Sequence, residues 1–362
     1  MIIYPIIGII LFLMSLIDSY VFANMAKNNM VIQRLVFIFI SLFFIFFVGF
    51  RENCGFDYDS YDNLFQEFSK SSLIQSWRNS NIELGYIILN IILGNFKLLL
   101  FSMALITITL QFLFIYKYSP LPFLSLFLLL GVMIYPSIMG QYRQALAVSI
   151  MCWAFISKDN KIKFFFLLII AMFFHTSALF GVIVLLIPDN KLLSLWLYLI
   201  IMSLALLINF FVKQLFVDIT NYLPGMISER VDYYSETDDY IVGFNAAMVM
   251  RIVVFLIFYY FRKEITSYPK GTIFFNLYFV SLFIYLGFGF LPQISLRAGY
   301  YFYIFEFILT SMLLFRLQGP TKFILFMFFV GIGFYRQFVF FSDWSLDYIP
   351  YQNSLIDISS YY

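Results

Sequence analysis

The feature that most constrains this chain is the recurrence of long, almost uncharged apolar runs. Most of them approach the roughly 20 residues that a helix needs to cross a bilayer. They are also much longer than the alternating segments of about ten residues that build outer-membrane barrels. We therefore predict an all-α polytopic membrane protein whose apolar runs are 2–22, 31–50, 98–116, 121–136, 141–157, 193–212, 245–261, 272–291, 298–315 and 322–341, with a further interrupted run at 163–187.

Composition excludes the soluble alternatives. Hydrophobic residues make up 63% of the chain and charged residues 12%, whereas a soluble domain has roughly 45–50% and 25%. A water-soluble fold could not cover this much apolar surface with polar groups. Soluble enzymes, nucleic-acid-binding proteins and disordered scaffolds are excluded, and the lipid bilayer is the first expected partner. The first run has no basic flank and no small-residue cleavage site, so we expect a retained helix rather than a signal peptide.

Metal and cofactor chemistry has no support in the residue inventory. The chain has two cysteines, Cys54 and Cys152, and one histidine, His175. This set is too small for a disulfide framework or a zinc cluster. The sequence also has no GxGxxG motif and no Walker loop, which argues against nucleotide-driven transport. We expect no metal and no cofactor.

Short basic connections set the orientation, because Lys and Arg collect on the cytoplasmic side of membrane proteins. Two longer segments, 51–80 and 214–243, carry more acid than base and are expected outside as outer-face loops. The connections expected inside contain Lys27 and Arg34, Lys117, Lys158, Lys161 and Lys163, Arg262, Lys263 and Lys270, and Arg316 and Lys322.

The interrupted run 163–187 decides on which side of the membrane every later connection lies. One continuous span there would place the basic connections after 261 and 315 outside. Two short helices with a tip near His175 keep every basic connection inside. Non-helical backbone at such a break is tolerated only within protein or beside a water-filled cavity, so His175 is expected at the outer rim of a cavity. We predict one integral domain over 1–362 with about twelve transmembrane or re-entrant segments, both termini outside, and an interfacial helix at 82–94.

Arginines gather on the outer side of this topology, against the usual bias. Each could extend to lipid headgroups or pair with a loop carboxylate. A shared anion explains the whole set better, because guanidinium groups bind phosphate oxygens in pairs and remain charged. We predict a lipid-linked phosphate or pyrophosphate bound by Arg143 and Arg297, with supporting roles for Arg51, Arg251 and Arg336.

Acidic, aromatic and imidazole side chains near these arginines are candidates for chemistry. Gly55 permits a tight turn that would present Asp57 and Tyr58 to the helix end, although the same segment also fits an ordinary solvated turn. Glu83 is an interfacial acid, or simply a charge at a helix N-terminus. His175 is a candidate base or phosphate ligand, or a structural hydrogen-bonding group. The base is expected to be His175 or Asp57, with Glu83 contacting an acceptor hydroxyl or an arginine.

These residues form an ordered set of motifs that resembles the EpsG family, within the wider Wzy-like polysaccharide polymerases. The set runs from about residue 50 to 351, and a small departure is Gly-Phe-Asp-Tyr where the family usually has Gly-Thr-Asp-Tyr. The matching pieces are Arg51 with Gly55-Phe56-Asp57-Tyr58 and Tyr61, then Glu83-Leu84-Gly85-Tyr86, Arg143-Gln144-Ala145-Leu146-Ala147, Phe173-Phe174-His175-Thr176-Ser177-Ala178-Leu179, and Arg297 with Tyr300-Tyr301-Phe302.

The resemblance implies a GT-C-like glycosyltransferase whose outer loops form an active site facing the periplasm, in the bacterial inner membrane. Such polymerases transfer a growing glycan from its undecaprenyl pyrophosphate carrier to the non-reducing end of a lipid-linked repeat unit. A chain-length regulator is then a candidate partner. The sugar contacts expected from the matching motifs are Tyr58, Tyr61, Gln144 and Tyr300.

Two other classes of protein remain open at this point. A flippase for lipid-linked oligosaccharides would need cations across both leaflets, whereas here they gather on one side. A membrane O-acyltransferase that modifies surface glycans would need a His or Ser nucleophile system and a cytoplasmic acyl donor. A catalytically inert assembly partner is the remaining alternative.

Overall fold

The structure is a computed structural model that describes residues 2–24, 30–220 and 246–355. The chain forms two compact units. The first comprises residues 1–182 and 310–362, and the second comprises residues 183–309. Each unit is described by itself below. The second outer segment of the sequence analysis, 214–243, begins within helix α10 (Leu195–Thr220), and its acidic run 229–239 lies outside the described residues.

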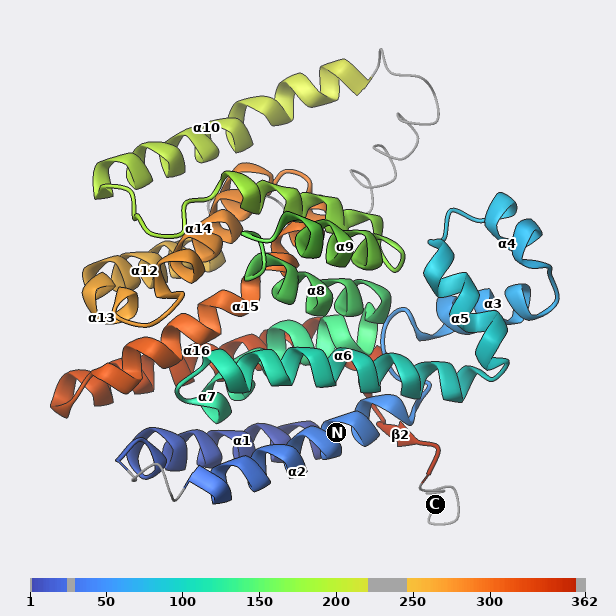
Figure 1. The fold of residues 1–362 in the computed structure, drawn as a ribbon, viewed down its shortest axis with the longest axis horizontal. Helices are drawn as coiled ribbons and strands as arrows, with labels where there is room; N and C mark the ends of the chain where they lie inside the picture. The colour runs from blue at the N-terminus through green and yellow to red at the C-terminus, as the bar shows by residue number, and fades with distance from the viewer. Residues whose placement is uncertain (1, 25–29, 221–245, 356–362) are drawn as a thin grey trace. The chain divides into compact units, whose positions relative to one another are not determined.

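Helices make up nearly all of the first unit (Figure 1). In it, α1 packs on α7, α2 packs on α6, and both α6 and α9 pack on α8. The elements are α1 (Ile3–Tyr20), α2 (Met30–Gly49), α3 (Tyr58–Ser69), α4 (Leu73–Asn79), α5 (Leu84–Leu93), α6 (Phe96–Tyr118), α7 (Pro122–Leu129), a π-helix (Leu130–Gly140), α8 (Tyr142–Phe155), α9 (Lys161–Met172), the start of a 3₁₀-helix (Thr176–Leu186) and α16 (Gly319–Tyr348), with the strands β1 (Arg51–Glu52) and β2 (Gln352–Asn353).

The second unit contains α10, α12 (Ala246–Tyr260), α13 (Arg262–Thr266), α14 (Gly271–Gly287) and most of α15 (Pro292–Arg316). Within it, α10 packs on α14, and α12 and α13 also contact α14. Buried aromatic rings fill these contacts: the ring of Tyr198 lies 4.6 Å from that of Phe279 and 5.2 Å from that of Phe255, measured between centroids. Both pairs have the edge-to-face geometry that aromatic quadrupoles favour.

The class predicted from the sequence is confirmed: this is an all-α polytopic membrane protein. Within the described residues, six helices are long and apolar enough to cross a bilayer, namely 3–20, 31–49, 96–118, 122–140, 295–316 and 319–348. Shorter apolar helices cover 84–93, 176–186, 195–211, 246–260 and 271–287. The count of about twelve segments and the GT-C-like architecture stay predictions.

A buried carboxylate joins three helices at one end of the first unit. Asp18, which is fully buried near the end of α1, accepts a hydrogen bond of 2.7 Å from the side-chain amide of Gln33 in α2. It also accepts one of 2.9 Å from the backbone N–H of Phe123, in the first turn of α7. Leu121, which precedes α7, has no side chain that could cap it. Asp18 thus satisfies a donor that the sequence next to α7 leaves unpaired, as an N-cap residue normally does.

The segment 51–80, expected as a loop, contains two short helices. In α3, the side chains of Tyr58, Tyr61, Phe65 and Phe68 are buried, and they recur at helical spacing while polar residues occupy the other face. This periodicity defines an amphipathic helix whose apolar face packs against the rest of the chain. Helix α4 begins with a capping box between Ser72 and Gln75. The sequence analysis predicted a loop here because it considered only the polar composition of the segment and not its periodicity.

The end of the chain packs back on the segment that follows α2. Strand β2 pairs antiparallel with β1, so that Asn353 lies opposite Arg51. The hydroxyl of Tyr351 donates to the carbonyl of Phe47 at 2.6 Å, and the two rings stack with centroids 4.4 Å apart. The tyrosine-rich end of the chain therefore holds the backbone around Arg51 in place.

The helix break predicted at His175 is confirmed. Helix α9 ends at Met172, and the 3₁₀-helix begins at Thr176. Neither piece reaches the roughly 20 residues of α-helix that a full crossing needs. A helix end inside an apolar run leaves carbonyls and N–H groups that require partners, and the partners found at this break belong to the site described next.

Candidate active site

Arg143 lies in the first turn of α8, immediately after the π-helix ends. π-Helical turns are rare and often occur at functional sites. The loop after α2 packs on the end of this π-helix, where a side chain on Gly55 would meet the carbonyl of Met139 at 2.7 Å. Gly55 also has a φ of +117°, which favours glycine. These contacts bring Arg51 and Arg143, which are far apart in the sequence, to the same end of the first unit.

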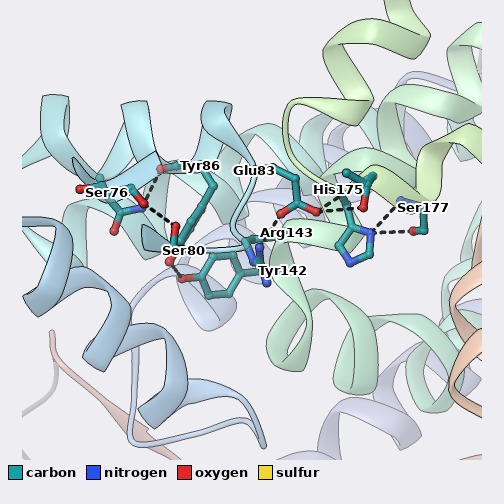
Figure 2. Close-up of polar contacts among 10 residues, drawn as sticks. Ser76, Ser80, Glu83, Tyr86, Tyr142, Arg143, His175 and Ser177 are labelled. Carbon is teal, nitrogen blue, oxygen red and sulfur yellow. Dashed lines mark hydrogen bonds and ion pairs between the residues drawn. The ribbon is translucent and has the colours of Figure 1, made fainter. Parts of the chain in front are cut away.

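Glu83 and Arg143 form an ion pair at the centre of the site (Figure 2). A guanidinium nitrogen of Arg143 lies 2.5 Å from the Oε2 of Glu83, and the two side chains are only 16% and 9% exposed. The other carboxylate oxygen, Oε1, accepts hydrogen bonds from the N–H of Thr176 at 3.0 Å and from its hydroxyl at 3.4 Å. Glu83 precedes α5 without capping it. Its carboxylate instead joins α8 to the helix break, which confirms the expectation of an arginine partner.

The backbone of Gly85 packs directly on the helix break. Its N–H donates to the carbonyl of Phe173 at 2.9 Å. A Cβ at this position would lie 2.7 Å from that carbonyl oxygen and 2.9 Å from the Cβ of Phe173. Only glycine lets the start of α5 approach the break this closely, and the approach is what carries Glu83 to Thr176.

Gly85→Ala should therefore destabilise the protein by about 1–3 kcal/mol, the usual cost of overpacking a close contact. The measurement is the midpoint of thermal unfolding of the purified protein in detergent. Gly331→Ala is the matched control, because no atom lies within 4 Å of a Cβ there. In the interior of α16 that change should stabilise the helix by about 0.5–1 kcal/mol. Equal midpoints for the two variants would contradict the close contact.

Three tyrosines lie between Arg51 and Arg143. The ring centroids of Tyr61 and Tyr142 are 4.0 Å apart, and the hydroxyls of Tyr86 and Tyr142 share a hydrogen bond of 2.6 Å. The guanidinium carbon of Arg143 lies 5.5 Å from the ring centroid of Tyr61 and 5.4 Å from that of Tyr86. Arg51 lies 5.7 Å from that of Tyr142. These distances are within the range of cation–π attraction.

The hydroxyl of Tyr61 stays protonated in this environment. Burial raises its pKa above the ordinary value, and the nearby charges of Asp57 and Glu83 add to the rise, although Arg143 opposes it. A neutral Tyr61 offers Arg143 its ring face but no negative charge. Glu83 therefore supplies the formal countercharge that the structure shows beside Arg143.

Arg51 is held by backbone carbonyls rather than by a carboxylate. It donates to the carbonyl of Val48 at 2.7 Å and to that of Cys54 at 3.1 Å, and it is 2% exposed. Within the described part of the chain, the NH2 group of Arg51 and the Nε of Arg143 have no hydrogen-bond partner. Both guanidinium groups thus have hydrogen-bonding capacity beyond their contacts within the protein.

Asp57 and Tyr58 begin α3 directly after the Gly55 turn. The N–H of Tyr58 donates to the carbonyl of Gly55 at 2.9 Å, and Asp57 takes the N-cap position without capping the helix by its side chain. The Asp57 side chain is partly exposed. The ring of Tyr58 is buried and packs edge-on against Phe96 at 5.4 Å between centroids. Asp57 is therefore the more accessible of the two.

The contacts of His175 with Ser177 favour one tautomer. Its Nδ1 accepts a hydrogen bond of 3.3 Å from the backbone N–H of Ser177 and lies 2.6 Å from the hydroxyl of the same residue (Figure 2). A backbone N–H can only donate, so Nδ1 is the acceptor and the neutral ring carries its proton on Nε2. In this state His175 presents a donor, and not a lone pair, on its other nitrogen.

A pocket of about 390 Å³ opens beside the ion pair. Glu83 and Thr176 line it, and His175 is not among its lining residues. Sequence analysis missed Trp77, which is 58% exposed in α4, and Asn81, which follows that helix. A single Trp within the polar segment 51–80 was the available signal. The remaining lining residues are Ile82, Leu84, Ile169, Met172 and Phe173.

The other candidate residues fall in three places. Gln144 is buried within α8, and the side chain of Arg336 is buried in α16, whose backbone at that point packs closely on Gly131. Arg251, Arg297 and Tyr300 belong to the second unit, where the guanidinium carbon of Arg251 lies 4.1 Å from the ring centroid of Tyr285 and 4.3 Å from that of Tyr303. The structure brings together Arg51, Arg143, Glu83 and Tyr61, and a role for the remaining arginines beside them stays a prediction.

No metal centre is evident in the part of the chain that the structure describes. It contains no group of three or more His, Cys, Asp or Glu side chains that could hold an ion. Cys54 and Cys152 are both buried and unbridged.

The apolar helices define a multi-pass membrane protein, and the family comparison identifies it as one of the polysaccharide-polymerase type, a glycosyltransferase-like class. The chain belongs to the EpsG family, whose family model matches residues 34–353. The match spans every motif that suggested the resemblance. Comparison with curated proteins and with solved structures gives no match.

Proposed function

We propose that this protein is a GT-C-like polymerase on the outer face of the bacterial inner membrane. It transfers a growing glycan from undecaprenyl pyrophosphate to the non-reducing end of a lipid-linked repeat unit. The observation that carries the proposal is the part-buried pair of Arg143 and Glu83 at the edge of an open pocket, with Arg51 across the tyrosine cluster. In the proposed reaction these two guanidinium groups stabilise the departing pyrophosphate.

In the proposed reaction, a hydroxyl oxygen of the acceptor sugar attacks the anomeric carbon of the donor. The bond from that carbon to the pyrophosphate oxygen breaks, and the carrier pyrophosphate leaves with the bonding electrons. Negative charge grows on the leaving oxygen, so preorganised donors there lower the barrier. Arg143 and Arg51 supply such donors, and the Nε2–H of His175 is a third.

The contacts of His175 favour Asp57 for the remaining role, that of the base. The acceptor proton needs a base with an available lone pair. In the structure the accepting nitrogen of His175 contacts Ser177, and Asp57 is partly exposed beside the Gly55 turn. We therefore place Asp57 as the base and His175 as a donor to the pyrophosphate. Glu83 positions Arg143.

The pocket beside Glu83 suits a sugar. Exposed indole rings stack on the CH faces of sugars, and Asn81 and Glu83 offer an amide and a carboxylate for hydroxyl groups. Trp77→Leu should raise the KM for the lipid-linked repeat unit by about fivefold, since aromatic contacts of this kind contribute on the order of 1 kcal/mol. The assay is polymer yield against substrate concentration.

An exposed Trp could also serve only as an interfacial anchor. Trp77→Phe keeps a ring and should retain most of the affinity. Trp196→Leu removes a Trp that is 76% exposed in the other unit and should leave KM unchanged. Equal KM values for Trp77→Leu and Trp196→Leu would remove Trp77 from the sugar site.

The proposal requires the site to face outward. A membrane-impermeant maleimide should label Lys70→Cys and Asp232→Cys in intact cells, and Asp159→Cys only after permeabilisation. Cys54 and Cys152 are buried and should give little background. Labelling of Asp159→Cys in intact cells, with protection of Lys70→Cys, would invert the topology and place the pocket inside.

The decisive experiment for the activity uses the purified protein and a lipid-linked repeat unit. A polymerase should convert the repeat unit into a ladder of lipid-linked oligosaccharides without added nucleotide or metal. Transbilayer movement of the substrate in vesicles, without growth, would instead identify a flippase. Transfer of an acyl group would identify an O-acyltransferase.

A further inference from the structure

A second pocket, of about 670 Å³, lies within the second unit. Nothing in the proposed polymerase reaction uses it. We propose that it binds a phosphate group. Its lining residues are Asn190, Leu192, Leu193, Ser194, Tyr259, Arg262, Lys263, Thr266 and Thr272.

The lining has the composition that phosphate recognition requires. Arg262 and Lys263 supply two positive charges, while Ser194, Thr266 and Thr272 supply hydroxyl donors. The lining residues, all within the described part of the chain, include no carboxylate that would neutralise the two cations inside the pocket. Phosphate oxygens accept charge-assisted hydrogen bonds from guanidinium and ammonium groups and further bonds from hydroxyls.

The loop on one side of the pocket is held in position by hydrogen bonds within the protein. The side-chain amide of Asn276 donates to the carbonyls of Pro188 at 2.9 Å and Lys191 at 3.0 Å. The hydroxyl of Tyr198 accepts from the N–H of Leu193 at 3.2 Å and donates to Asn276 at 2.8 Å. Tyr198 and Asn276 are buried. Asn190 and Ser194 are thus held by a buried polar network, which lowers the entropic cost of binding.

Arg262, on the other side, is also oriented in advance. One of its nitrogens donates to the carbonyl of Tyr259 at 3.0 Å, and its guanidinium carbon lies 4.6 Å from the centroid of the Tyr259 ring. This contact uses one edge of the guanidinium and leaves its other N–H donors directed elsewhere. Arg262 and Lys263 begin α13, so that both cations border the pocket from one short segment.

The expected topology indicates where the phosphate comes from. Arg262 and Lys263 belong to a basic connection predicted to face the cytoplasm. A phosphate group on that side belongs either to an anionic phospholipid of the inner leaflet or to a soluble phosphorylated compound. The chemistry recognised is the same for both sources, and the experiment below separates them.

The test uses the full chain purified in detergent. Native mass spectrometry measures retention of phosphatidylglycerol against phosphatidylcholine. Replacing both cations, as Arg262→Gln with Lys263→Gln, should weaken phosphatidylglycerol binding by about tenfold or more, because hydrogen bonds to charged groups are strong. The control, Lys161→Gln with Lys163→Gln, removes the same charge from exposed positions of α9 and should leave retention unchanged. Thr266→Val keeps both cations and should weaken binding by a few-fold.

A second arm measures the thermal unfolding midpoint in millimolar inorganic phosphate. If the source is soluble, phosphate should raise the midpoint of the wild type and not that of the double variant, while phosphatidylglycerol retention is equal in both. If the source is lipid, retention should depend on the pocket and phosphate should have no effect. Equal losses in the pocket and control variants, or no response to either probe, would overturn the proposal. Neither arm depends on polymerase activity.

Discussion

Replacing Arg143 with lysine is expected to lower the rate of polymer formation by about 10²–10³-fold. A donor that stabilises charge in the transition state is typically worth this much. Lysine keeps the charge, and hence a partner for Glu83, so the fold should survive. It loses the planar fork that can bind two phosphate oxygens and the stacking surface between Tyr61 and Tyr86. The measurement is the ladder assay, normalised to the amount of folded protein.

Two further variants define what this result means. Arg143→Ala would also leave Glu83 as a nearly buried carboxylate without its cation, which can destabilise a protein by about 3–5 kcal/mol. Lysine is therefore the cleaner test of chemistry. Arg78→Lys, an exposed position at the end of α4, is the matched control and should polymerise normally. If Arg143→Lys makes polymer at the wild-type rate, Arg143 does not bind the leaving group through its fork.

The individual residues of the site could be predicted from the sequence, but most of their contacts could not. The sequence pointed to Arg143, Glu83 and His175 because each is a charged or polar group within or beside an apolar segment. Such groups are costly in a membrane and are usually kept for a function. Glu83 and Arg143 are ion-paired across α5 and α8. The position of Glu83 depends on the contact between Gly85 and Phe173, which are 88 residues apart in the sequence. No local sequence pattern predicts such a contact.

The tyrosine cluster shows the same limit of local reasoning. Tyr61 appeared in a motif, whereas Tyr142 and the ring contacts of Tyr86 had no distinguishing signal in an aromatic-rich chain. The aromatic content is 22%, so no single ring stands out by type. Only packing identifies the rings that lie between Arg51 and Arg143.

The arginines predicted on the outer side have different partners, although they were found by one pattern. Arg51 uses backbone carbonyls, Arg143 uses a carboxylate, and Arg251 lies against two tyrosine rings. The shared position relative to the membrane was inferred from topology, which does not specify the partner of each cation. Functional tests should therefore treat the arginines one at a time.

The second large effect concerns the base. Asp57→Asn is expected to lower turnover by about 10²–10⁴-fold, the usual contribution of a positioned general base, with little change in binding of the lipid-linked substrate. Asn is nearly isosteric and cannot take up a proton at neutral pH. Asp59→Asn, an exposed position in the first turn of α3, makes the same change of charge and should retain activity.

The pH–rate profile distinguishes Asp57 from His175. A base must be unprotonated to act, so activity falls on the acidic side as the base takes up a proton, and this limb should be absent from the residual activity of Asp57→Asn. His175→Gln replaces the Nε2–H with an amide N–H, so it should retain part of the activity and keep the acidic limb. If His175→Gln loses the limb and Asp57→Asn keeps it, the roles are reversed, and the tautomer set by Ser177 changes when substrate binds. If both variants polymerise at wild-type rates, neither residue is the base, and the arginine site must act on an acceptor activated elsewhere.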